Sequence, residues 1–147
     1  RAKGVALVRL AALILFTFPG SPTIFYGDEA GMEGFEDPFN RGTYPWGHED
    51  RELLGHFARL GTLRRSRSAL QKGTLSWIAA NGPLLAFARE GADGRLVTVV
   101  NADRAEQRLS LPWSGDTATD LLTGQEFFPE AGVLTLCIPP RGGFLLG

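Results

Sequence analysis

Hydrophobic residues in the first eighteen positions show no alternation with polar residues and recur on nearly every face of a helix. Alanine and leucine dominate residues 2–18, and the first proline is Pro19, so we expect a helix over this range. A helix that is apolar on most sides needs neighbours on most sides. The run Thr23-Ile24-Phe25-Tyr26, rich in β-branched and aromatic residues, then predicts a buried strand that ends at Gly27.

Residues 28–49 have no period and are rich in glycine, proline, aromatic and acidic residues, which predicts a long loop. Asp50 suits the N-cap of a second helix that extends to about Arg67. Four apolar positions, three and four residues apart, give this helix one buried face: Leu53, Phe57, Leu60 and Leu63. Long ordered loops are usually functional, so residues 28–49 are the first place to seek a site.

The pattern changes after Leu70, and we place a domain boundary near residues 71–73. Short apolar runs now alternate with turn sequences built from Asn, Asp, Gly and Pro. Three of these runs fit strands of an antiparallel β-sandwich, at residues 83–89, 95–100 and 133–138. The expected organisation is therefore residues 1–70, with helices and one strand, followed by a β-sandwich over residues 71–147.

The order helix, strand, loop, helix is that of the closing unit of a parallel α/β fold, because parallel strands need helical crossovers. One strand cannot form a parallel sheet, so residues 1–70 must complete a sheet outside this chain or pair with another copy. The start at Arg1 and the single internal Met32 also suggest a fragment. We expect the isolated chain to self-associate through residues before Gln71. A well-behaved monomer on a sizing column would contradict this expectation.

Composition and charge exclude several classes of function. A net charge of −1 gives no footprint for nucleic acid or an anionic membrane surface. The apolar run at residues 5–18 is interrupted by Arg9 and is shorter than the ~20 residues that cross a bilayer, which favours a buried helix over a signal or a span. Cys137 is the only cysteine, so it has no internal disulfide partner, and its apolar neighbours predict a buried thiol. Cytoplasmic and secreted locations both stay open.

The sequences PGSPTIFYGDEAGM and DPFNRGTYPW, which begin at Pro19 and Asp37, resemble motifs in the C-terminal part of the α-amylase family, glycoside hydrolase family 13. The sequence PGSPTIFYGDEAGM, from Pro19, is similar to the motif of the family's eighth strand, with Phe25 where a tyrosine is common. The sequence DPFNRGTYPW, from Asp37, is similar to the family's Asp-Pro-x-x-Arg followed by Trp. Residues 120–124 and 138–143 look like its C-terminal β-domain. The GTYPWG form resembles the neopullulanase, cyclomaltodextrinase and amylopullulanase branch most closely.

This resemblance implies a fold of α/β plus all-β class. Residues 1–70 would be the C-terminal end of a (β/α)8 TIM barrel, with its last helices and strand eight, and residues 71–147 an antiparallel β-sandwich C-domain. In relatives, the Asp and Arg of the Asp-Pro-x-x-Arg motif contact donor-side sugars, so Asp37 and Arg41 are expected to bind substrate, together with Tyr26. A carboxylate accepts from sugar hydroxyls and a guanidinium donates to them.

Two simpler roles stay open for these residues. Asp37 and Arg41 could form a salt bridge that only pins the loop. The aromatic residues around them could pack rather than stack on sugars; these are Tyr26, Phe39, Tyr44 and Trp46. The same two alternatives apply to Trp77, Trp113 and Phe144. These residues could form a platform for a sugar, or they could pack in the core or between the domains.

The resemblance places the family's three catalytic carboxylates before Arg1, so we expect no catalytic residue in this chain and no activity from it alone. The full-length parent would be a retaining glycosidase acting on an α-glucan or maltooligosaccharide, without an organic cofactor. Asp28 and Glu29 are adjacent, so along a strand their side chains point to opposite faces and cannot flank one bond. Acidic residues of the loop match no calcium-binding spacing, so we expect no metal here and leave calcium open for the parent.

Two other classes of function compete with this hypothesis. A carbohydrate-binding or structural module would bind oligosaccharides without upstream residues. A non-catalytic amylase-like protein, such as the ectodomain of an amino-acid transporter heavy chain, would lack the carboxylates in its parent gene. The preference for α-1,4 or α-1,6 bonds, and for hydrolysis or transfer, stays open in all cases.

Overall fold

The computed structural model describes residues 2–34 and 36–147. Within this part, helices occupy the first half of the chain: α1 (Ala2–Thr17), the short 3-10 helix η1 (Phe39–Arg41), α2 (Arg51–Ser66) and α3 (Ser68–Lys72). The second half is made of strands: β1 (Thr74–Asn81), β2 (Leu84–Gly91), β3 (Gly94–Asn101), β4 (Gln107–Pro112), β5 (Ala118–Thr119), β6 (Glu126–Phe127), β7 (Val133–Ile138) and β8 (Gly142–Leu146).

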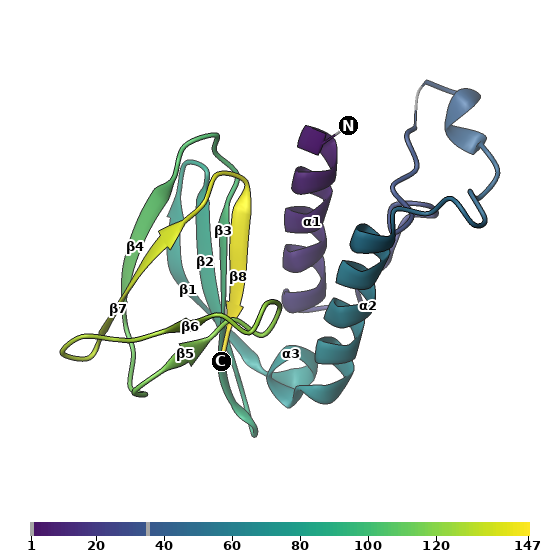
Figure 1. The fold of residues 1–147 in the computed structure, drawn as a ribbon. Helices are drawn as coiled ribbons and strands as arrows, with labels where there is room; N and C mark the ends of the chain where they lie inside the picture. The colour runs from purple at the N-terminus through teal and green to yellow at the C-terminus, as the bar shows by residue number, and fades with distance from the viewer. Residues whose placement is uncertain (1, 35) are drawn as a thin grey trace.

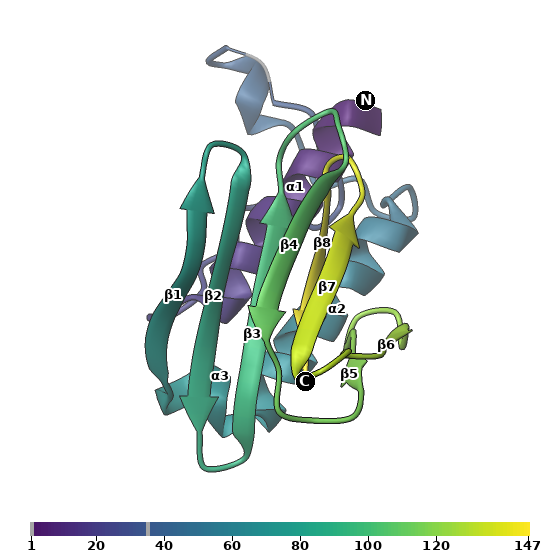
Figure 2. The same ribbon diagram turned by 90° about the vertical axis from the view of Figure 1, so that its left-hand side faces the viewer.

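The strands form an antiparallel sandwich, as the turn spacing predicted. The central sheet has the order β1-β2-β3-β8, and β4 pairs with β7 in a second sheet. Figure 2 shows β4 and β7 in front of the central sheet, with the helices behind it. The molecule therefore has three layers, and the helices and the β4–β7 pair cover opposite faces of one sheet (Figure 1).

Both faces of the central sheet are buried at β2, β3 and β8, because these strands alternate between two hydrophobic clusters, whereas β1 at the edge has no buried residue. Toward β4 and β7, the cluster includes Ala86, Ala88, Val97, Val99, Phe144 and Leu146. Toward the helices, Leu96, Val100 and Leu145 join Leu10, Leu13, Phe16, Leu53, Phe57 and Leu60. This double burial explains why β2 and β3 are nearly continuous apolar runs rather than alternating ones.

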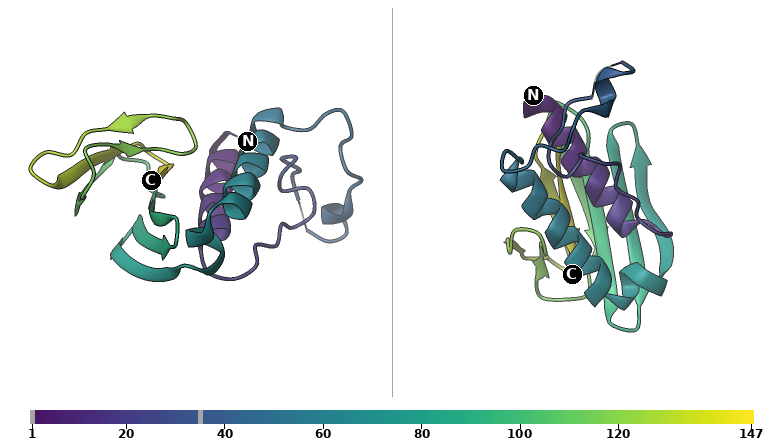
Figure 3. Two further views of the ribbon diagram at one scale, coloured as in Figure 1. Left: turned by 90° about the horizontal axis from the view of Figure 1, so that it is seen from below. Right: turned by 90° about the vertical axis from the view of Figure 1, so that its right-hand side faces the viewer.

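The two long helices lie side by side on the central sheet, with α1 crossing β3 and β8 (Figure 3). The predicted N-cap of α2 is confirmed, because the backbone N–H of Leu53 donates to Asp50 Oδ1 at 3.1 Å. The predicted face is confirmed as well: Leu53, Phe57 and Leu60 are buried, and Leu63 packs against them. No helix among the described residues is long and apolar enough to span a membrane.

The predicted strand at residues 23–26 is wrong for this chain. Residues 21–25 have no regular secondary structure, and residues 26–31 form turns. A strand requires a neighbouring backbone, and the described strands all pair within the C-terminal half. Ile24, Phe25 and Tyr26 are consequently exposed.

The prediction of a buried Cys137 is also wrong. Strand β7 alternates strictly, with Leu134, Leu136 and Ile138 facing the core of the sandwich. Cys137 lies between two of them and therefore points outward, where it is exposed. Its apolar neighbours in the sequence belong to the opposite face of the strand.

Candidate functional site

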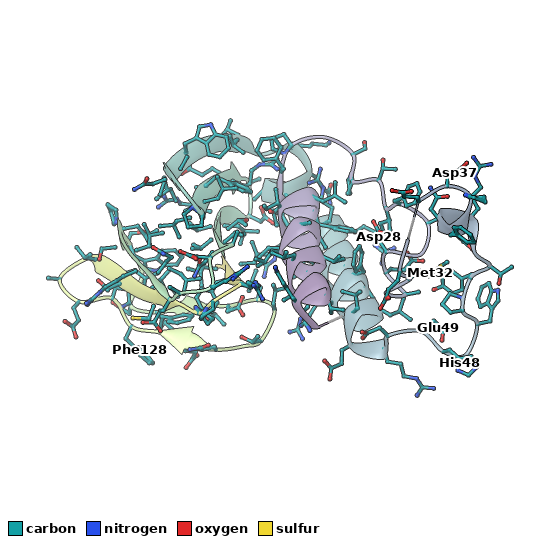
Figure 4. The ribbon with its side chains drawn as sticks, turned by 90° about the horizontal axis from the view of Figure 1, so that it is seen from above. Asp28, Met32, Asp37, His48, Glu49 and Phe128 are labelled. Carbon is teal, nitrogen blue, oxygen red and sulfur yellow. The ribbon has the colours of Figure 1, made fainter. Side chains whose placement is uncertain are left out.

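The segment between α1 and α2, residues 18–50, projects away from the helices and the sheet. We call it the α1–α2 loop. Figure 4 shows Asp37 and His48 at its outer part, while Phe128 lies at the opposite end of the molecule. All residues that the sequence predicted to bind substrate lie in this loop.

Asp37 and Arg41 form a pair across the 3-10 helix η1. Their spacing of four residues brings Arg41 Nε to 2.8 Å from Asp37 Oδ1. The two side chains remain 75% and 60% exposed for Arg41 and Asp37 respectively, so the pair adds little to stability, about 0.3–0.5 kcal/mol. The predicted salt bridge is therefore present, and its charged groups stay accessible to a ligand.

Tyr26 connects two parts of the loop. Its hydroxyl donates to the carbonyl of Gly42 at 2.8 Å, immediately after η1. Its ring lies 6.1 Å from that of Tyr44, whose ring is 4.6 Å from that of Trp46. We call Tyr26, Tyr44 and Trp46 the aromatic row. Trp46 is 80% exposed, so a broad apolar face is open at the end of the aromatic row.

Three carboxylates of the α1–α2 loop act electrostatically on this region: Asp28, Glu29 and Glu49. Partial desolvation, followed by the negative charges of Glu29 and Glu49, raises the pKa of Tyr44, whose hydroxyl also contacts Glu29. Burial and the adjacent Glu29 raise the pKa of Asp28. Glu29 Oε2 is buried and has no hydrogen-bond partner among the described residues. An unpartnered buried carboxylate oxygen is costly, so this position calls for a donor from elsewhere.

The base of the loop is anchored by two arginines that the sequence analysis missed. Arg64 of α2 donates to the carbonyls of Phe16 at 3.0 Å and Phe18 at 2.8 Å, and also to that of Gly20. Arg89 of β2 donates to the carbonyl of Thr17 at 2.7 Å. Cations suit the C-terminal end of a helix, where carbonyls lack helical partners.

Arg89 is the more unusual of the two, because it is almost fully buried. It also donates to the carbonyl of Gly73 at 2.9 Å, while its Nε has no partner among the described residues. Burial, and then the charge of Arg64, lower the pKa of Arg89. A signal existed in the sequence: Arg89 has the same parity along β2 as Leu85, which packs against the cluster on the helix side.

The other candidate residues have packing roles. Phe144 is buried, and Trp113 donates from Nε1 to the carbonyl of Thr117 at 3.1 Å. Trp77 is exposed, but its ring packs at about 6 Å from those of Phe18 and Phe87. His56 Nε2 lies 3.1 Å from the carbonyl of Arg9, and burial is the main cause that lowers its pKa. No three His, Cys, Asp or Glu side chains gather as a metal site in the part of the chain that the structure describes.

Comparisons with known proteins agree with this architecture. Residues 78–145 match the family model described as "Maltogenic Amylase, C-terminal domain". The chain is 33% identical to an amylopullulanase of Thermoanaerobacter thermohydrosulfuricus over 99% of its length, and 37% identical to neopullulanase 2 of Thermoactinomyces vulgaris over 96%. This chain belongs to the α-amylase family. It spans 11% and 25% of those two relatives, respectively.

The structural comparison extends the relationship to both halves of this α-amylase-family chain. An Anoxybacillus α-amylase has a TM-score of 0.87 and 25% identity, and the match covers 97% of this chain and 32% of that protein. The predicted fold class, the end of a (β/α)8 barrel followed by a β-sandwich, is therefore confirmed, as is the predicted branch of the family. The domain boundary near residues 71–73 stays a prediction, because the helices and the sheet share one hydrophobic cluster.

Proposed function

We propose that this chain is the C-terminal part of a retaining hydrolase of α-glucans, and that its α1–α2 loop contributes donor-side contacts to the sugar. The catalytic carboxylates would lie upstream, so the chain alone is inactive. The observation that carries this proposal is the Asp37–Arg41 pair, which is formed before any ligand binds and is still accessible. Preorganised groups lose less freedom on binding than mobile ones.

The chemistry of the pair matches a sugar. The bridge uses Arg41 Nε and Asp37 Oδ1, which leaves the terminal guanidinium nitrogens as donors and the second carboxylate oxygen as an acceptor. A glucose unit offers hydroxyls that both donate and accept, with apolar C–H faces between them. The exposed ring of Trp46 supplies a surface of the kind that packs on such a face. Tyr26 would hold the two parts of the loop together through its bond to Gly42.

Kinetics of the full-length enzyme would test this proposal. We expect Asp37→Asn and Arg41→Gln each to lower kcat/KM for maltooligosaccharides by about 10-fold or more, because a hydrogen bond to a charged group contributes about 1.5–3 kcal/mol. Arg108→Gln is the matched control, since Arg108 is exposed on the outward face of β4. Unchanged kcat/KM in both loop variants, with only the melting temperature altered, would mean that the pair merely pins the loop.

A binding module is the second candidate, favoured only by the openness of Trp46. Calorimetry of the isolated chain with maltooligosaccharides separates the two, because a module binds without upstream residues and our proposal expects negligible binding. We also propose that the isolated chain self-associates through exposed apolar side chains of its first part, including Leu7, Leu15, Ile24 and Phe25. Size-exclusion chromatography with light scattering would overturn this by showing a monomer at all concentrations.

A further inference from the structure

A second candidate site lies away from the α1–α2 loop. A cleft of about 390 Å³ opens where α1 and α2 meet the β5–β6 and β7–β8 connections. Its floor is apolar and includes Leu10, Leu13 and Gly143, while its other lining residues are mostly polar or charged. This volume is in the range of pockets that hold small organic ligands.

The charge of the lining is strongly biased. Arg9 comes from α1, Arg59 from α2 and Arg141 from the β7–β8 connection, so three guanidinium groups from three separate elements line one cleft. Asp120 is the carboxylate that lines it. Three arginines against one aspartate give the lining a formal charge of +2.

Asp120 does not neutralise these arginines by pairing with them. It is fully buried, and its carboxylate accepts from the backbone N–H of Leu122 at 3.3 Å and of Leu145 at 3.0 Å. The backbone N–H and the hydroxyl of Thr123 donate to it as well, at 3.2 and 2.6 Å. These four donors hold the β5–β6 connection against β8, so the aspartate has a structural role of its own.

The arginines keep most of their donors. Arg59 Nε donates to the carbonyl of Leu121 at 3.1 Å, which directs the side chain from α2 toward the β5–β6 connection and leaves its terminal nitrogens. Arg9 is 4.0 Å from Glu52, whose side chain is 90% exposed, so that ion pair is weak. His56 also lines the cleft, and its Nε2 is within hydrogen-bond distance of the carbonyl oxygen of Arg9, at 3.1 Å.

We propose that this cleft binds a phosphate monoester of a small organic molecule, with the phosphate among Arg9, Arg59 and Arg141 and the carbon body on the apolar floor. A guanidinium group matches phosphate oxygens bidentately, and a monoester at neutral pH carries a charge of about −1.5 to −2, close to that of the lining with opposite sign. An uncharged glucan is a poorer fit, because none of the described residues that line the cleft is Trp, Tyr or Phe. The ligand would bridge the helices and the sandwich and stabilise their contact.

Titration of the full-length enzyme that contains this chain with phenyl phosphate would test the proposal, by calorimetry and by the shift in melting temperature. We expect saturable binding of one molecule per chain, with an affinity at least 5-fold higher than that of inorganic phosphate, because phosphate alone leaves the floor uncovered. Absence of saturable binding would overturn the proposal. Equal affinities for inorganic phosphate and for phenyl phosphate would show that the carbon part of the ester does not contact the apolar floor. This result would also overturn the proposal.

Matched variants locate the site. Arg141 has a φ of 49°, in the left-handed region that favours glycine, so Arg141→Gly removes the charge without straining the backbone. We expect Arg141→Gly and Arg59→Gln each to weaken phenyl phosphate binding by 10-fold or more. Arg108→Gln removes the same charge from the outward face of β4 and should leave binding unchanged. Equal weakening by Arg108→Gln would show a general effect of net charge and contradict the site.

Discussion

The α1–α2 loop and the β2–β3 hairpin are both held against helices, but by different kinds of contact. The loop is anchored at its base by Arg64 and Arg89, whose long side chains donate to carbonyls at the end of α1. The hairpin touches α3 with its backbone. A Cβ placed on Gly91 would lie 2.4 Å from the backbone nitrogen of Ala69, so the two segments leave no space between them.

The tip of the hairpin also caps α3. Asp93 Oδ2 accepts from the backbone N–H of Ser68 at 2.8 Å, and Oδ1 accepts from that of Ala69 at 2.9 Å. The Ser68 hydroxyl donates to the same carboxylate at 2.5 Å. Backbone contact tolerates almost no displacement, whereas arginine side chains can follow a moving carbonyl. The α1–α2 loop, which we propose to contact sugars, is thus the region held by flexible arginine side chains rather than by direct backbone contact.

The largest expected effect comes from filling the hairpin contact. Gly91→Ala should destabilise the chain by about 3 kcal/mol, because the added methyl group meets backbone atoms of Ser68 and Ala69 that cannot rotate away. Urea unfolding monitored by circular dichroism measures this change. Gly55→Ala is the control, since Gly55 is in α2 with nothing within 4 Å of an added Cβ. It should stabilise by up to about 1 kcal/mol. Similar stabilities for the two variants would refute the close contact.

Arg64→Met is expected to lower the stability of the chain by a smaller amount and to loosen mainly the α1–α2 loop. Losing three donors to exposed or half-buried carbonyls should cost about 1–2 kcal/mol, because water can replace part of the interaction. Amide hydrogen exchange should accelerate in residues 19–34 and stay unchanged in β2 and β3. Arg65→Met, on the exposed side of the same helix, controls for charge. Uniform acceleration across the chain would contradict a local anchor.

The smallest effect is a dependence on pH. The hydrogen bond from the Ser68 hydroxyl, followed by those from backbone amides, lowers the pKa of Asp93 in the folded chain. The unfolded chain then binds the proton first, so the stabilisation is present above the ordinary aspartate value of 3.8 and is lost as the pH falls below it. Asp93→Asn should flatten the decline in stability between about pH 5 and about pH 3. Asp116→Asn, in the exposed segment before β5, should leave that decline as steep as before.

The sequence predicted correctly those helices and strands whose formation depends on residues close together in the chain. Alternation and turn residues located β2, β3 and β7, and the Asp50 cap with its apolar spacing located α2. The four-residue spacing of Asp37 and Arg41 allowed the salt bridge that the structure contains. The roles of these residues in binding stay predictions.

Features that depend on distant partners escaped the sequence analysis. Residues 23–26 have the composition of a strand, but hydrogen bonding across a sheet requires a neighbour, and composition does not supply one. Arg64 and Arg89 contact carbonyls more than forty residues away along the chain, so no local pattern predicts these partners. The parity of Arg89 along β2 indicates only the face of the sheet on which it lies. The cleft beside Arg141 is lined by α1, α2 and the β5–β6 and β7–β8 connections. These elements are far apart in the sequence, so the sequence analysis missed the cleft as well.

The double burial of the central sheet has a practical consequence for engineering. A cassette of residues 71–147 transplanted into another protein would present Leu96, Val100 and Leu145 to water, because these side chains normally lie under α1 and α2. Such a graft would need either the two helices or polar replacements at those three positions. Inheritance of this module between proteins should therefore follow the helices and the strands together.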